Sequence, residues 1–253
     1  MIKNILTGIK AYAGTFQLIS TLKLWKYFAI PILISLVTAI SIGMLAYILS
    51  DNIGSFITKI WKWEFGKETF TAISSFIGGA IIVVFGFMLY KHIIMALSAP
   101  FMSPVSERIE AHLTNSEVHS HRNTSFNQQL WRGIRINIRN LFKEIIFTIP
   151  ILLIGFIPII GIVSTVLLFL VQAYYAGFGN MDYTLERHFN YKDSISFVKK
   201  YSGFAIGNGI IFMLFLLIPL FGVLLVLPLS VTAASTQTVE LLKIENKIVL
   251  NKT

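Results

Sequence analysis

Four long stretches of the chain carry no charged side chain. Residues 27–50 and 69–90 form runs of 24 and 22 such residues, and residues 145–181 and 201–239 form runs of 37 and 39. Because a helix needs about 20 predominantly apolar residues to cross a bilayer, the two shorter runs predict two spanning helices. The pattern is therefore typical of an all-α integral membrane protein.

The second run is expected to continue as a long helix beyond its last uncharged residue. Lys91 and His92 follow it, and the residues after them are again apolar, so we predict a long span over 69–99. Pro100 and Pro104 are the first strong stop and restart signals, because proline lacks the amide N–H that a helix interior needs. A separate short helix is expected to begin at the second of these prolines.

The two longest runs each contain a break near the middle. Pro158 lies in the first run and Pro219 in the second, and in each a glycine follows three residues later. Proline removes a backbone donor and glycine permits a turn, so each run predicts a helical hairpin. The arm 145–157 has 13 residues, or about 20 Å of helix, against a hydrocarbon core of about 30 Å. We therefore expect hairpins that penetrate the bilayer part-way and return; two pairs of slightly short spans are the alternative.

The remaining segments are predicted to lie at the membrane surface or in the cytoplasm. Residues 1–22 place apolar side chains on one helical face and lysines off it, which is typical of an interfacial amphipathic helix. Residues 104–144 are expected to form cytoplasmic helices around a polar loop, with a helix starting at Ser125, and 240–253 to form a tail. All of 1–253 is thus one integral-membrane domain.

Composition excludes a water-soluble domain and indicates an anionic partner. Of the 253 residues, 55% are hydrophobic and only 13% are charged, whereas soluble chains carry about 25% charged residues. Lys and Arg number 21 against 12 Asp and Glu, and this excess favours an anionic membrane surface or an anionic solute over a nucleic acid. The chain has no cysteine, which excludes disulfides and thiolate chemistry.

Basic residues are distributed unevenly between the predicted loops. If each hairpin returns to the side that it left, 18 of the 21 Lys and Arg residues lie on one side of the membrane and 3 on the other. By the positive-inside rule this places both termini in the cytoplasm.

No constellation of nucleophile, base and orienting group is evident, so the sequence does not predict an enzyme or a bound cofactor. His112, His119 and His121 form the one histidine cluster, but it lies in a polar loop without a carboxylate at helical spacing. No metal site is therefore expected.

Three groups of charged residues near the predicted spans have two interpretations each, as a solvated or headgroup-facing surface and as part of an anion site. At the start of the first span, an anion is favoured by free backbone donors and the helix dipole. Arginine side chains bind oxyanions well, because one guanidinium group can donate two parallel hydrogen bonds to the same anion. The groups are Lys23 and Lys26 around Trp25; Glu107, Arg108 and Glu110 after the long span; and the helical stripe of Arg132, Arg135, Arg139 and Lys143.

Several short motifs are weak alone but specific in their order and spacing. They are Ser98-Ala99-Pro100-Phe101 with the Glu107–Leu113 stretch, Ile157-Pro158-Ile159-Ile160-Gly161 with Met181-Asp182-Tyr183, and Ile218-Pro219 with Leu227-Pro228. Together they resemble the CysZ sulfate-transporter family, which shares a superfamily with the etoposide-induced membrane proteins. The resemblance runs from about residue 6 to residue 237.

The resemblance implies an inner-membrane protein with two long spanning helices and two partly penetrating hairpins. It also implies assembly into homo-oligomers and passage of sulfate inward for cysteine synthesis. The family commonly has Gly-x-Arg-Arg ahead of the first span, whereas this chain has Trp25 and Lys26 at the arginine positions. Lysine keeps the charge but lacks the bidentate fork of arginine.

Two functions from different classes remain. The first is a channel or transporter for sulfate or another oxyanion, in which Lys23 and Lys26 bind the anion beside Trp25. In this hypothesis the path contains a polar network that comprises Glu107, Arg108, Glu110 and Arg139. The second is a membrane-structural or scaffold protein of the same fold that transports nothing.

Overall fold

The structure is a computed structural model that describes residues 1–58, 67–115, 125–155, 157, 160–218 and 220–247. Every regular element in these residues is a helix, which confirms the predicted all-α class. The helices are α1 (Ile2–Lys10), α2 (Thr15–Thr21), α3 (Trp25–Thr58), α4 (Lys67–Thr114), α5 (Phe126–Ile154), α6 (Ile160–Leu185), α7 (Tyr191–Lys200), α8 (Ser202–Leu216) and α9 (Phe221–Ile244).

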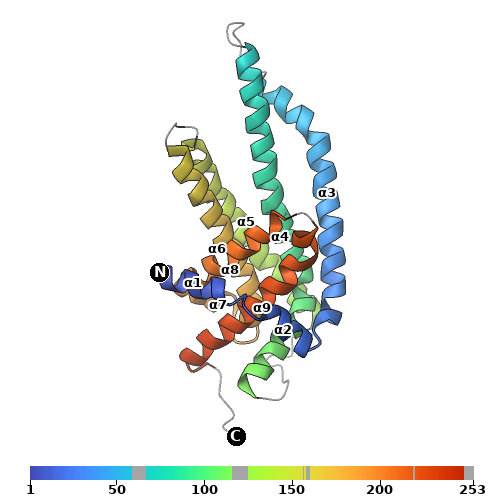
Figure 1. The fold of residues 1–253 in the computed structure, drawn as a ribbon, viewed down its shortest axis with the longest axis vertical. Coiled ribbons are helices and arrows are strands. Elements are labelled where there is room, and N and C mark those ends of the chain that lie inside the picture. Colours follow the sequence, from blue (N-terminus) through green and yellow to red (C-terminus); the bar gives the residue numbers. More distant parts are fainter. Residues whose placement is uncertain (59–66, 116–124, 156, 158–159, 219, 248–253) are drawn as a thin grey trace.

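Three antiparallel helix pairs form the body of the molecule (Figure 1). The pairs α3–α4 and α5–α6 diverge toward one end, and α8 and α9 lie across the base between them. Four segments are long and apolar enough to cross a membrane: Trp25–Ile48, Ile82–Thr114, Gly161–Leu185 and Phe221–Ile244. The protein is therefore a multi-pass membrane protein in its architecture.

Helix α4 does not end at residue 99 as the prolines suggested. It continues through Pro100 and Pro104 to Thr114. Pro100 leaves the Ala96 carbonyl without its helical donor, and Gly133 of α5 approaches this carbonyl so closely that an added Cβ would lie 3.0 Å away. Prolines are tolerated inside membrane helices where neighbouring helices and side chains compensate for the lost hydrogen bond, and the sequence rule for soluble helices does not allow for this.

Helix α5 also differs from the prediction. The basic amphipathic segment and the first hairpin arm form one helix of 29 residues, about 44 Å long. The Ser125 capping box is present, with the side chains of Ser125 and Gln128 each accepting from the other's backbone. The pairs α5–α6 and α8–α9 are helical hairpins. Pro158 and Pro219 lie outside the described residues, and the depth of the hairpins in a bilayer stays a prediction.

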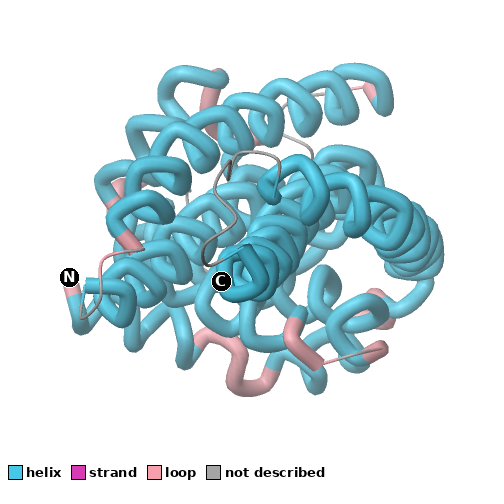
Figure 2. Tube along the Cα trace, turned by 90° about the horizontal axis from the view of Figure 1, so that it is seen from above, coloured by secondary structure: helices cyan, strands magenta, loops and turns pink. Residues whose placement is uncertain are grey.

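Helix α8 packs tightly against both α6 and α1. Seen from above, the described chain consists of helices and the loops that join them (Figure 2). Gly177 of α6 lies on the Ala205 carbonyl, and Gly209 of α8 lies on the Ala173 carbonyl, so that a Cβ at either glycine would overlap backbone atoms. The α6–α8 contact therefore requires glycine at both positions.

The N-terminal segment is two short helices separated at Gly14, whose φ is 81°. It is not a free surface helix, because the Tyr12 hydroxyl donates to the Asn208 carbonyl (2.9 Å) and is also hydrogen-bonded with the Ser230 hydroxyl (2.6 Å between the oxygens). Burial raises the pKa of Tyr12 well above its ordinary value. The segment is thus fixed to α8 and α9.

Candidate functional site

The residues predicted to bind an anion lie at the start of α3. Lys23 and Lys26 are exposed, and Lys23 adopts a left-handed backbone conformation with a φ of 53°. Trp25 is half-buried and its Nε1 donates to Ser20 Oγ at 3.3 Å. The two ammonium groups are therefore accessible to an anion from outside the bundle.

The ring of Tyr27 connects this group with the C-terminal part of α4. Lys26 Nζ and the Arg108 guanidinium each lie 5.2 Å from its centroid, within the range of cation–π attraction. Two residues that the sequence assigned to separate groups thus share one aromatic partner. Glu107 is half-buried next to them along α4.

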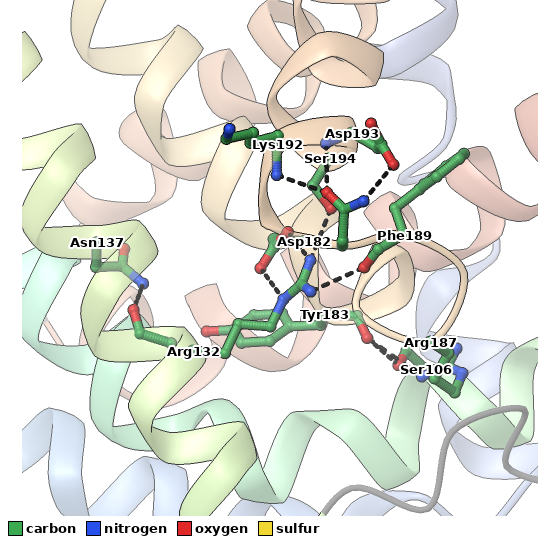
Figure 3. A network of polar contacts seen from close by, with 12 residues as sticks. Ser106, Arg132, Asn137, Asp182, Tyr183, Arg187, Phe189, Lys192, Asp193 and Ser194 are labelled. Atoms are coloured by element: carbon green, nitrogen blue, oxygen red, sulfur yellow. Dashed lines mark hydrogen bonds and ion pairs between the residues drawn. The ribbon is translucent and has the colours of Figure 1, made fainter.

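Glu110 is buried in an ion-pair cluster with two residues that follow α6. Arg187 donates to Glu110 Oε2 through Nη2 at 2.8 Å, and His188 Nε2 lies 2.9 Å from Oε1. Arg187 Nη1 also donates to Ser106 Oγ (2.6 Å) and to the Tyr183 carbonyl (3.2 Å), as Figure 3 shows. These bonds fix α4 to the end of α6.

A second cluster surrounds Arg132 of α5. Its Nη2 and Nε donate to the two oxygens of Asp182 at 2.9 and 3.2 Å, its Nη1 donates to the Phe189 carbonyl at 2.9 Å, and Nη2 reaches Ser194 Oγ at 2.7 Å (Figure 3). Bidentate pairing of this kind is strong and directional. Arg132 therefore connects α5, α6 and the start of α7.

Glu186 lies between these two clusters and is 4% exposed. Burial raises its pKa to about 7, and the neighbouring Asp182 raises it further, whereas a hydrogen bond with Ser103 and the charges of Arg132 and Arg187 oppose the shift. Its Oε1 has no hydrogen-bond partner among the described residues. This carboxyl group therefore changes its charge near neutral pH.

A third cluster lies deeper in the bundle, between α4, α5 and α6. Glu144 Oε1 accepts from Lys91 Nζ at 2.6 Å, and Glu144 Oε2 lies 2.8 Å from His92 Nε2. Lys91 also donates to the Gln172 carbonyl at 3.0 Å, and His92 Nδ1 lies 3.2 Å from Asn137 Oδ1. Lys91 and Glu144 are fully buried.

Arg139 makes contacts of its own. Its Nη1 donates to Asn140 Oδ1 at 2.7 Å and its guanidinium lies 5.3 Å from the Phe178 ring centroid. Three of the four residues assigned to the path thus have different partners: Arg108 contacts Tyr27, Glu110 pairs with residues after α6, and Arg139 contacts its helical neighbour and an aromatic ring.

Sequence reasoning passed over the charged residues that are buried most deeply. From the sequence alone, Lys91 and His92 continue the second span, and Glu144 only bounds an uncharged run. Their position within a predicted membrane helix is itself a signal, because an ionisable side chain there costs free energy unless it has a partner. Pairing them required the register between α4 and α5, which a single sequence does not contain.

The sequence profile of one protein family, described as sulfate transporter CysZ/etoposide-induced protein 2.4, matches residues 11–227. The chain belongs to this family. The matched region contains all three buried clusters as well as Lys23, Trp25 and Lys26. A search of curated proteins found no significant match. The resemblance to the CysZ family inferred from short motifs is therefore confirmed.

The arrangement of these charged groups offers recognition by charge. Arg132 and Arg187 carry planar donors held by carboxylates, and Lys91 carries a fully buried ammonium that is paired with Glu144. Such groups recognise oxyanions when an anion replaces or supplements the carboxylate.

Proposed function

We propose that the protein passes sulfate, or a closely related oxyanion, inward across the cell inner membrane and so supplies sulfur for cysteine synthesis. The observation that carries this proposal is the match to a sulfate-transporter family over residues 11–227. Four bilayer-length helices and buried cations within the bundle support it. A transport role rather than an enzymatic one fits a site built from ion pairs.

In this proposal Lys23, Lys26 and Trp25 bind the anion at one mouth of the path. Glu107, Arg108, Glu110 and Arg139 belong to the path itself. The shared contact of Lys26 and Arg108 with Tyr27 supports a continuous route between the first group and the second. Because both termini are proposed to lie in the cytoplasm, this mouth is the one through which the anion leaves.

We also propose that the hairpins penetrate the bilayer part-way and that several copies assemble into a homo-oligomer. Exposed apolar side chains along α3 and α5 support contact with lipid or a further copy, since they would be costly in water.

Uptake of labelled sulfate into proteoliposomes that contain the purified full-length protein tests the proposal. Saturable uptake above that of protein-free liposomes is expected, and an excess of unlabelled sulfate should suppress it. A correctly folded protein that takes up no sulfate would contradict the proposal and favour the scaffold alternative.

A further inference from the structure

An open cavity of about 450 Å³ lies beside α7 and contains none of the residues assigned to the anion site or the path. Its α7 wall consists of positions 193, 196, 197 and 200, which share one face of the helix. The loop after α6 and the residues after α9 complete the lining. The cavity is therefore built where the ends of α6 and α9 meet α7.

This cavity lies at the depth of lipid headgroups. Two bilayer-length segments, Gly161–Leu185 and Phe221–Ile244, end beside it. The first lining residues after them are His188 and Glu245, three residues and one residue further along the chain, which is within about 5 Å at about 1.5 Å per residue. The headgroup layer on each side of the hydrocarbon core is itself about 5–8 Å thick. Ile244, next to Glu245, is 72% exposed, and lipid is a favourable contact for such a side chain.

Asp193 carries a negative charge without a counter-ion at one end of the α7 wall. Its Oδ2 accepts from Asn190 Nδ2 at 2.6 Å. Among the side chains that the structure describes, no cation forms an ion pair with Asp193. Nor do any three acidic or histidine residues in the described part of the chain lie so that they could hold a metal ion. An amine suits this carboxylate, because it brings both a positive charge and N–H donors.

The opposite end of the α7 wall carries a surplus positive charge. Lys200 lies seven residues further along the helix, or about 10.5 Å along its axis, and pairs with Glu245 Oε1. The Tyr201 hydroxyl donates to the same oxygen at 2.7 Å. The hydrogen bonds from Lys200 and Tyr201 lower the pKa of Glu245, which therefore stays ionised at neutral pH. The Lys247 ammonium has no hydrogen bond or ion pair with any residue that the structure describes, so two lysines face one carboxylate.

Between the two charged ends the lining is partly apolar. Phe189 and Phe197 both line the cavity, with their ring centroids 5.3 Å apart. His188 lines it too, but its Nε2 lies against Glu110 outside the cavity, and the charge count above does not depend on it. A ligand that fits this lining carries a cationic group at one end, an oxyanionic group at the other, and methylenes between them.

We propose that the cavity binds the headgroup of a phospholipid with a primary amine, such as phosphatidylethanolamine, with the amine at Asp193 and the phosphate at Lys200 and Lys247. The two charges of this headgroup match the two ends of the cavity in sign, and its methylenes lie against the phenylalanine rings. The depth of the cavity favours a lipid over a dissolved zwitterion, because the bilayer already holds headgroups at this level. The site does not depend on which solute the protein transports.

Other phospholipid headgroups fit less well. Phosphatidylcholine has a quaternary ammonium without an N–H, so it cannot donate a hydrogen bond to Asp193. Phosphatidylglycerol has the phosphate but no cationic group, and Asp193 repels its net negative charge. The cavity should therefore prefer phosphatidylethanolamine over both.

Native mass spectrometry of the purified full-length protein tests this preference. The protein in a non-ionic detergent is titrated with each of the three lipids, which have identical acyl chains, and the fraction that retains a lipid gives an apparent affinity. Asp193→Asn removes the charge and keeps the acceptor for Asn190, and Lys247→Gln removes a charge that faces the phosphate. Glu240→Gln and Lys199→Gln are the matched controls, because both side chains are exposed and neither lines the cavity.

The two cavity variants should affect the lipids differently. Asp193→Asn is expected to lower the affinity for phosphatidylethanolamine about threefold and to leave that for phosphatidylcholine unchanged, because exposed charge pairs contribute modestly. Lys247→Gln should lower the affinity for both lipids about threefold, since both carry the phosphate. The two controls should behave as the parent does. Equal affinities of the parent for the two lipids, or parent affinities in both cavity variants, would overturn the site.

Affinity rather than melting temperature is the measurement that decides. Asp193 lies in the first turn of α7, where an acidic side chain stabilises the helix, so Asp193→Asn lowers stability for a reason unrelated to lipid. Both Asp193 and Lys247 are exposed, and their substitution leaves the core packing intact. If Asp193→Asn does not fold, Lys247→Gln alone decides, and a parent affinity for phosphatidylethanolamine would overturn the site.

Soluble phosphoethanolamine separates the headgroup from the lipid. It carries the same two charges without acyl chains and is titrated into the lipid-free protein in the same detergent. We expect it to bind more weakly than phosphatidylethanolamine, because the acyl chains add apolar contact. Tighter binding of the soluble compound would overturn a lipid as the occupant of the cavity.

Discussion

The two lysines at the start of α3 expose their charge to the solution. If Lys23 and Lys26 bind sulfate, changing both to Gln should lower the affinity about tenfold or more, because each charge-assisted bond contributes about 1.5–3 kcal/mol and 1.4 kcal/mol is a factor of ten. Calorimetric titration with sulfate measures this. Trp25→Arg, which supplies a bidentate donor, should tighten binding.

Snorkelling lysines that only contact lipid headgroups would give another result. The double Gln protein would then keep the parent affinity for sulfate while inserting less uniformly into liposomes. Equal affinities would therefore remove both lysines from the site.

Glu186 should make the stability of the protein depend on pH. Its pKa is raised from 4.5 to about 7, so the folded state holds the proton more tightly than the unfolded state does. The contribution of protonated Glu186 to the free energy of unfolding is therefore fully present below about pH 4.5. It is lost as the pH rises toward 7, and the loss is at most about 3 kcal/mol. Glu186→Gln stays neutral, and its melting temperature should exceed that of the parent at pH 8 more than at pH 5.

The comparison requires that the other titrating groups respond alike in both proteins. His188, Asp182, Arg132 and Arg187 are retained in Glu186→Gln, so they contribute equally to both pH profiles. Identical slopes of melting temperature against pH would show that Glu186 does not titrate in this range.

The contact between α6 and α8 depends on backbone approaching backbone. In an isolated helix Gly→Ala stabilises by about 1 kcal/mol. At Gly177 or Gly209 the added Cβ overlaps a carbonyl of the facing helix, and overpacking of this kind costs about 1–3 kcal/mol or more. We expect either substitution to lower the melting temperature in detergent.

Gly43 of α3 provides the control for this prediction. A Cβ there meets nothing within 4 Å, so Gly43→Ala should leave the melting temperature unchanged or raise it. If Gly177→Ala and Gly209→Ala raised the melting temperature as Gly43→Ala does, helix propensity rather than interhelical packing would explain the effect.

The elements show where sequence reasoning succeeds. Runs without charge predict α3, α6 and α9, because bilayer length and apolar composition are local properties. The extension of α4 through Pro100 and Pro104 was missed, since tolerance of proline depends on a facing helix that a single sequence does not reveal. For the same reason Glu110 was found as a candidate but its partner Arg187, 77 residues away, was not.

The distribution of basic residues predicts the orientation of the whole molecule in the membrane. A reporter fused after Thr253, or inserted near Ser120, should read as cytoplasmic, because 18 of 21 basic residues lie on that side in the predicted topology. Paired fluorescent and alkaline phosphatase fusions measure this, with a fusion in the loop between α3 and α4 as the opposite control. A periplasmic signal at either cytoplasmic position would invert the topology.

The attachment of Tyr12 to α8 and α9 has a consequence for biosynthesis. Tyr12 leaves the ribosome early, yet its partner Asn208 is 196 residues further along the chain. The N-terminal helices therefore cannot make these contacts until α8 and α9 have been synthesised. Nascent chains that end before α8 lack both of these partners, so the contacts that fix the N-terminal segment cannot form in such truncated products.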